Sequence, residues 1–160
     1  MKTLVVYYSI TGRNEQLAKG VRDAFTRRGH TAEIHGLKTV VPLSALTGVL
    51  MSVLRRPSKL AALPPVEDAE ILVIVGPVWA SSLCPAVRAF LNALDNLEGK
   101  SIVNLVVGYG IYEQLMRKIN HTLKVRKADK VVSRALRLKD MDSHDKIDDL
   151  ANEVAEEVLP

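Results

Sequence analysis

The chain has 160 residues, 48% of them hydrophobic and 25% charged, with a formal net charge of +4 and one cysteine. This length and composition predict a single domain over residues 1–160, and the lone Cys84 excludes an internal disulfide or a multi-cysteine metal site. The basic residues are dispersed and have no aromatic platform for single strands beside them, so we expect no nucleic-acid partner.

The first 36 residues predict a strand, a helix and a second strand. Lys2–Tyr8 is a short run of apolar, β-prone residues, which is typical of a buried strand. Arg13–Arg28 has apolar residues at helical spacing, and Gly29 stands where a helix commonly ends. Thr31–His35 alternates polar and apolar residues, as a strand at a sheet edge does. Because the first strand begins almost at once, we expect no signal peptide. Together with the single cysteine, this indicates a reducing, cytoplasmic setting.

Residues 37–66 form an extended helical insert. Within it, Leu43–Arg56 places apolar residues at helical spacing, and prolines follow. Two interpretations are open. The segment covers the sheet and a ligand crevice, or its apolar stripe contacts a second copy of the chain, another partner or a membrane surface. No apolar run approaches the roughly 20 residues that span a bilayer, so we expect no integral membrane segment.

The second half predicts three more strands, each followed by a helix. Ile71–Val75 and Ile102–Val107 are fully apolar, as central strands are, whereas Val131–Leu138 is mixed and suits an edge. The helices are expected at Pro85–Leu94, Tyr112–Val125 and Ser143–Leu159.

This alternation predicts an α/β fold, with helices on both faces of a five-stranded parallel sheet. The two mixed strands are the second and the fifth in the chain, so they belong at the edges, and the order 2-1-3-4-5 places them there. Ligands of such sheets bind at the carboxyl ends of the strands, where the loops after the central strands converge.

The loop after the first strand has the composition of a phosphate site. Ser9, Thr11 and Asn14 are short polar residues around Gly12, directly between a strand and a helix. Backbone N–H groups at a helix N-terminus, helped by such side chains, can hold a phosphate. An ordinary capped turn would use the same residue types. The motifs of P-loop nucleotidases, of dinucleotide-binding Rossmann domains and of phosphoacceptor response regulators are absent.

Two other loops supply flat side chains at the same edge of the sheet. Trp79, the only tryptophan, follows the third strand, and Tyr109 follows the fourth. Each can form a wall for a planar ligand or can pack against the protein instead. Gly76, Gly108 and Gly110 would let main-chain groups approach such a ligand.

Together these motifs resemble those of the flavodoxin-like family of FMN-binding proteins. Residues 9–14 look like its [ST]-x-T-G-x-[TN] phosphate loop, residues 76–79 like its G-x-P-x-[WY] loop, and residues 85–91 like its P-x-x-[KR]-x-F-[LIV] helix. The resemblance implies a flavodoxin-like three-layer sandwich that binds FMN. The cofactor-binding residues that it implies come from the three loops and are Ser9, Ile10, Thr11, Gly12, Arg13, Asn14, Pro77, Val78, Trp79, Ala80, Gly108, Tyr109 and Gly110.

The resemblance also implies electron transfer, to a redox partner protein or to a small-molecule electron acceptor. Three functions stay open: an electron carrier, an NAD(P)H-dependent FMN quinone reductase, and a flavin-free relative that acts as a binding module. The chain departs from electron-shuttling flavodoxins in two ways. Those proteins are typically acidic, whereas this chain has a net charge of +4. They also have a longer acidic loop after the fourth strand, where this chain has a brief one. Homodimer formation is open as well.

Other chemistry has no support in the sequence. The four histidines show no ligand spacing, so we expect no metal, and no Ser-His-Asp or paired-carboxylate pattern indicates a hydrolase. No catalytic residue is predicted. Cys84 stands at a helix start, where a thiolate would be stabilised, but a packed and inert thiol is the expectation.

Overall fold

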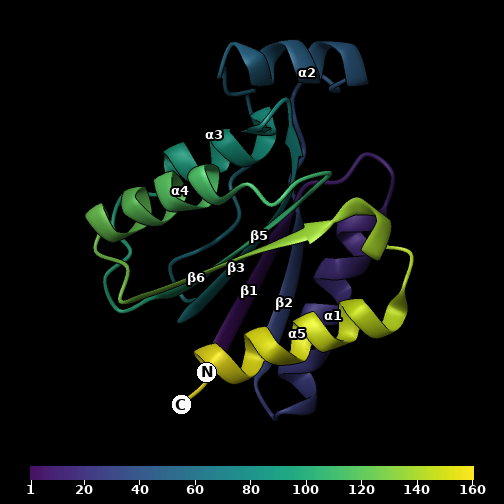
Figure 1. The fold of residues 1–160 in the computed structure, drawn as a ribbon. Coiled ribbons are helices and arrows are strands. Elements are labelled where there is room, and N and C mark those ends of the chain that lie inside the picture. Colours follow the sequence, from purple (N-terminus) through teal and green to yellow (C-terminus); the bar gives the residue numbers. More distant parts are fainter.

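Strands and helices alternate along residues 1–160, all of which are described by a computed structural model (Figure 1). The elements in chain order are β1 (Lys2–Tyr7), α1 (Arg13–Arg27), β2 (Thr31–Gly36), α2 (Ala45–Val53), β3 (Ile71–Trp79), β4 (Ser82–Leu83), α3 (Pro85–Ala93), β5 (Ser101–Gly108), α4 (Glu113–Val125), β6 (Lys130–Arg137) and α5 (His144–Val158). A 3₁₀ turn, Leu138–Asp140, follows β6. Every strand and helix expected from the sequence has its counterpart.

The five long strands form one parallel sheet in the order β2-β1-β3-β5-β6. With the short β4 left out of the count, this is the predicted order 2-1-3-4-5. The three inner strands are almost completely buried, whereas β2 and β6 are partly exposed. The apolar pattern of each strand therefore predicted its place in the sheet correctly.

One part of the sheet differs from the prediction. β3 continues to Trp79, so the loop expected at residues 76–82 is largely strand, and β4 turns back to pair antiparallel with it. Between them, Ala80 and Ser81 have φ angles of 50° and 56°, as a tight two-residue hairpin requires. Such turns usually contain Gly, Asn or Asp, so nothing in an Ala-Ser pair indicated a hairpin here.

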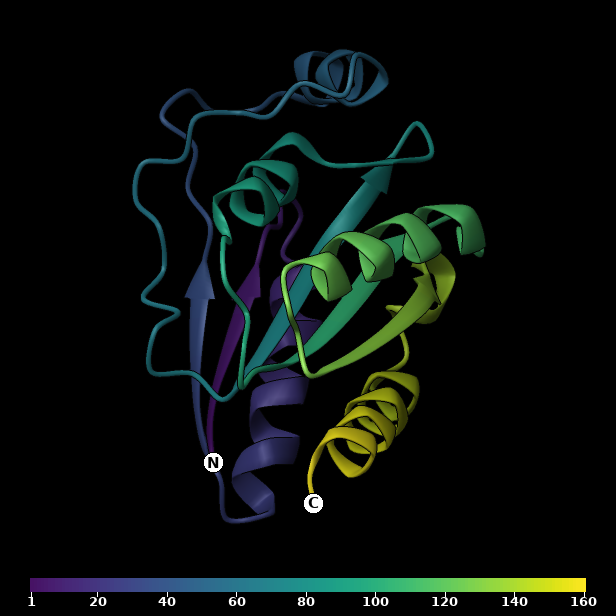
Figure 2. The same ribbon diagram turned by 90° about the vertical axis from the view of Figure 1, so that its left-hand side faces the viewer.

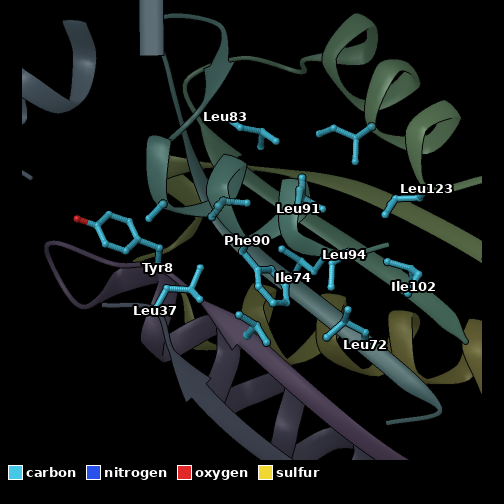
Figure 3. Close-up of a cluster of buried hydrophobic side chains, with 14 of the residues drawn as sticks. Tyr8, Leu37, Leu72, Ile74, Leu83, Phe90, Leu91, Leu94, Ile102 and Leu123 are labelled. Atoms are coloured by element: carbon cyan, nitrogen blue, oxygen red, sulfur yellow. The ribbon is translucent and has the colours of Figure 1, made fainter. Parts of the chain in front are cut away.

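Two apolar cores separate the sheet from its two helical layers. On one side, α3 and α4 contribute Phe90, Leu91 and Leu123 to a core that includes Leu72 and Ile74 of β3 (Figure 3). On the other side, α1 and α5 pack their buried faces on the opposite side chains of β3, which are Ile71, Val73 and Val75. Alternate residues of one strand thus belong to different cores, which makes the molecule a three-layer sandwich.

The insert between β2 and β3 carries α2 to the carboxyl ends of the strands, where the helix stands at an extremity of the molecule (Figures 1 and 2). A capping box at Ser44 begins the helix, with the Thr47 N–H donating to Ser44 Oγ and the Thr47 hydroxyl accepting from the Ser44 N–H. Backbone hydrogen bonds from Val40 to Lys59 and from Ala61 to Lys38 tie the two ends of the insert together. None of the helices is both long and apolar enough to cross a bilayer.

Candidate functional site

A cavity of about 370 Å³ opens at the carboxyl ends of β1, β3 and β5. This volume lies within the usual range for small-molecule sites. Its lining residues come from the three predicted loops, from α2 and from the segment after β6, and are Ile10, Thr11, Arg13, Asn14, Ala45, Val49, Pro77, Val78, Trp79, Val107, Gly108, Tyr109 and Leu138. The three loops thus converge on one crevice.

Nine of the predicted cofactor residues line this crevice, and four do not. The four are Ser9, Gly12, Ala80 and Gly110. Ser9 stabilises the turn of the phosphate loop, because its Oγ accepts the Gly12 N–H at 2.9 Å. Ala80 lies in the hairpin turn that follows β3.

The start of α1 is open toward the cavity. Gly12 is its N-cap residue, with a φ of 85° that favours glycine, and no side chain caps the helix. The first intrahelical hydrogen bond runs from the Gln16 N–H to the Gly12 carbonyl. The N–H groups of Arg13, Asn14 and Glu15 therefore have no acceptor within the helix. Free N–H groups and the positive end of the helix dipole make this loop a site for an anion.

Asn14 joins the loop to the helix. Its side chain is only 6% exposed, and its Nδ2 donates to the Tyr8 carbonyl at 3.0 Å. Its Oδ1 is buried without a hydrogen-bond partner. A buried acceptor in that state is costly unless a donor reaches it, and this residue lines the crevice.

Trp79 forms a wall that is itself supported on two sides. Its ring meets the Tyr8 ring edge-on, with 6.2 Å between centroids and 77° between planes. Gly48 of α2 lies against it so closely that a Cβ at position 48 would be 2.5 Å from the Trp79 ring. Both readings of this tryptophan therefore apply at once, since it packs against the protein and also lines the crevice.

Tyr109 is the opposite case, because 86% of its surface is exposed. Tyr112 stabilises the loop that carries Tyr109, because the Tyr112 hydroxyl accepts the Tyr109 N–H at 2.9 Å. The Tyr112 ring also lies on Gly108, where a Cβ would meet it at 2.5 Å. An aromatic ring on a supported loop, with its faces in solvent, can cover a planar ligand.

The glycines of these loops mostly serve packing. A Cβ at Gly76 would lie 2.4 Å from Val87 of α3, and Gly108 lies under Tyr112. Gly76 thus lets α3 approach β3 and does not line the crevice, whereas Gly108 accommodates the Tyr112 ring and also lines the crevice.

The sequence did not indicate several residues of the site. α2 contributes Ala45 and Val49 to the lining, which supports the interpretation that the insert covers the crevice. Leu138, which follows the edge strand β6, also lines it. The available signal was topological, since the carboxyl end of the last strand lies at the same edge of the sheet as the others.

A positively charged cleft adjoins the crevice and shares Arg13, Tyr109 and Leu138 with it. Its other lining residues are Arg137, Lys139 and Asp142. Arg13 forms an ion pair with Asp142 at 3.4 Å, so Arg137 and Lys139 are the lining cations that this acid leaves unpaired.

Cys84 is fully buried among apolar side chains although it caps α3. Burial raises the pKa of its thiol to about 12, against weaker opposing contributions from the backbone of Val87 and Ala86. The thiol is therefore neutral at physiological pH. No three His, Cys, Asp or Glu side chains gather as a metal site.

No protein-family model matches the chain, and no curated protein matches it in sequence. Solved structures do match. A flavodoxin from Streptococcus pneumoniae TIGR4 is 18% identical with a TM-score of 0.59, and the match covers 99% of this chain and all of that one. The chain has the flavodoxin-like fold. Another flavodoxin-like structure, flavodoxin 2 from Bacillus cereus, matches at 15% identity and a TM-score of 0.58, over 98% of this chain and 99% of the other. An NADH:FMN oxidoreductase called EMOB, in its apo form, matches at 18% identity and a TM-score of 0.68, over 98% and 88% of the two chains.

Proposed function

We propose that the crevice binds FMN and that the protein uses this cofactor for electron transfer. The observation that carries the proposal is the uncapped N-terminus of α1, which opens into a cavity lined by Trp79 and Tyr109. A phosphate monoester needs donors and positive potential, and a planar ring system needs flat apolar walls. This crevice has both, because the start of α1 and the aromatic residues Trp79 and Tyr109 line the same cavity.

The residues present fit the parts of FMN. The free N–H groups at Arg13, Asn14 and Glu15 suit the phosphate oxygens, and Thr11, which carries a hydroxyl, lines the same cavity. The ribityl chain carries hydroxyl donors, which is what the unpaired Asn14 Oδ1 lacks. A ring system against Tyr109 would cover a side chain that is otherwise almost entirely in water.

Bound FMN would supply reversible electron uptake, while the chain would determine how tightly the cofactor is held and how it is tuned. Arg13, Arg137 and Lys139 keep the mouth of the crevice positive, and positive potential favours the reduced, more negative cofactor. We therefore expect a reduction potential above that of acidic flavodoxins. A redox titration that gives an equal or lower value would contradict this trend.

The direct test is to add FMN to the purified protein. We expect a bound flavin spectrum after gel filtration and quenching of the emission of Trp79, the only tryptophan. Protein that stays colourless, with unchanged tryptophan emission, would leave only the third function, a flavin-free binding module.

A second function, NAD(P)H-dependent reduction of quinones through FMN, is favoured by the cleft that contains Arg137 and Lys139. Its cations lie beside Tyr109, at the mouth of the crevice, and would attract the phosphates of a pyridine nucleotide. The flavin-loaded protein is mixed anaerobically with NAD(P)H. Bleaching of the flavin by NAD(P)H alone would favour the reductase, and an unchanged spectrum would favour a carrier reduced by a protein.

A further inference from the structure

α2 exposes its apolar residues and buries its small ones. The helix, Ala45–Val53, contains no charged residue, and only Gly48 and Ser52 are buried. Ser52 satisfies its hydroxyl within the helix by donating to the Gly48 carbonyl at 2.8 Å. At 3.6 residues per turn, these two residues lie on the side opposite Leu46, Leu50 and Val53. An aliphatic face of the helix is therefore turned away from the protein.

The contact between Gly48 and Trp79 favours this orientation. Gly48 lies on the Trp79 ring with no room for a Cβ, so no larger residue of the helix could take its place there. Four aliphatic side chains consequently remain in water: Leu46 (81% exposed), Leu50 (57%), Val53 (59%) and Leu54 (55%). None of them lines the crevice, where α2 contributes Ala45 and Val49 instead.

The charges around α2 all have one sign. Residues 37–66 contain Lys38, Arg55, Arg56 and Lys59 and no Asp or Glu. All four cations are exposed, and none takes part in an ion pair. Exposed aliphatic side chains can enter the boundary between headgroups and acyl chains of a bilayer, and cations beside them are attracted to anionic lipids.

The position of α2 suits a broad, flat surface. In both views the helix stands beyond the carboxyl ends of the strands, and no other element reaches farther in that direction (Figures 1 and 2). We infer that the exposed face of α2, with Arg55 and Arg56, is a binding site for an anionic phospholipid surface. This inference concerns residues outside the crevice and does not require FMN.

A second copy of the chain fits this face less well. A two-fold contact through the insert would bring its four cations together with the same four of the partner, and the insert has no acid to offset them. α2 also stands at an extremity of the molecule (Figures 1 and 2), where the outer face of a helix is convex, so a partner would have to be concave or deformable. The headgroup region of a bilayer is deformable and supplies the negative charge.

Lipid binding would also affect electron transfer, a consequence that does rest on the proposed function. Because Ala45 and Val49 of the same helix line the crevice, a bound membrane would lie next to its mouth. A lipid-soluble quinone is the class of electron acceptor that this arrangement favours.

The test is flotation of the full chain with vesicles of phosphatidylcholine alone or mixed with phosphatidylglycerol. We expect binding to the anionic vesicles only, and release by high salt. The L46S/L50S and R55E/R56E variants should each lose at least about tenfold in partition coefficient, because one removes apolar contact and the other reverses two charges. The matched control is K124E/V125S, which makes the same kinds of change at exposed positions of α4.

The FMN spectrum of each variant is recorded separately, so that loss of lipid binding and loss of cofactor are told apart. The R55E/R56E variant changes residues that follow the helix, which keeps the test valid if L46S/L50S fails to fold. Absence of vesicle binding by the unmodified chain would overturn the inference. So would equal losses in the α4 control, or a soluble dimer that L46S/L50S dissociates, which would assign the face to a second copy.

Discussion

Gly12 and Gly29 stand at the two ends of α1 and allow the phosphate loop to be tested against an internal control. Their φ angles are +85° and +79°, and a Cβ at either position would meet no protein atom within 4 Å. Replacing either by Ala therefore costs only the left-handed conformation, about 1–2 kcal/mol in the free energy of unfolding. For a chain of this size that corresponds to a fall in Tm of roughly 2–8 °C.

The two substitutions should differ only in their effect on FMN. A methyl group at position 12 would stand in the loop proposed to hold the phosphate, whereas position 29 follows the far end of the helix. We expect Gly12→Ala to raise the Kd for FMN at least about tenfold, a loss of roughly 1.4 kcal/mol, and Gly29→Ala to leave it unchanged. Urea unfolding measures the stability of both variants, and flavin fluorescence titration measures the Kd. Equal affinities in the two variants, at matched stability, would refute the assignment of the phosphate to this loop.

Three further predictions concern the surroundings of the crevice. Gly48→Ala should lower stability by up to about 2 kcal/mol and shift the emission of Trp79, because overpacking of the ring outweighs the gain in helix propensity; a stabilised variant with unchanged emission would contradict the close contact. Cys84 should react with a disulfide reagent only as the protein unfolds. Because its pKa is about 12 in the folded chain and 9.0 ordinarily, its contribution to stability is complete below pH 9 and lost as the pH rises toward 12; a Cys84→Ala variant with the same alkaline loss of stability would exclude this cause. Arg137→Glu with Lys139→Glu should lower the reduction potential of bound FMN by some tens of mV, and an unchanged potential would show that these cations do not act on the cofactor.

The sequence predicted most of the fold because the composition of each strand reflects how far that strand is buried. β1, β3 and β5 are continuous apolar runs and lie inside the sheet, whereas β2 and β6 alternate and lie at its edges. The hairpin after β3 escaped prediction because Ala80 and Ser81 adopt left-handed conformations without the residue types that favour them. The turn is closed by the pairing of Val78 with Leu83 and of Trp79 with Ser82, which local residue preference does not reveal.

The candidate site was predictable to the extent that it depends on topology. Loops after neighbouring parallel strands had to meet, and Thr11, Trp79 and Tyr109 do line one cavity. That the insert covers the crevice was one of two interpretations of the sequence, but the residues of α2 that line it could not be derived, because the insert has no strand register to place it. One close contact of α2 with the rest of the fold is that between Gly48 and the Trp79 ring. Such a contact joins residues distant in the sequence and has no periodic signature.

That contact has a thermodynamic consequence. Since the same indole borders the crevice and supports α2, a ligand that displaces it alters the free energy of the helix above. Any coupling of this kind is reciprocal, so a surface that holds α2 must change affinity in the crevice by the factor with which crevice occupancy changes attachment to the surface. Measuring one of these two factors therefore gives the other.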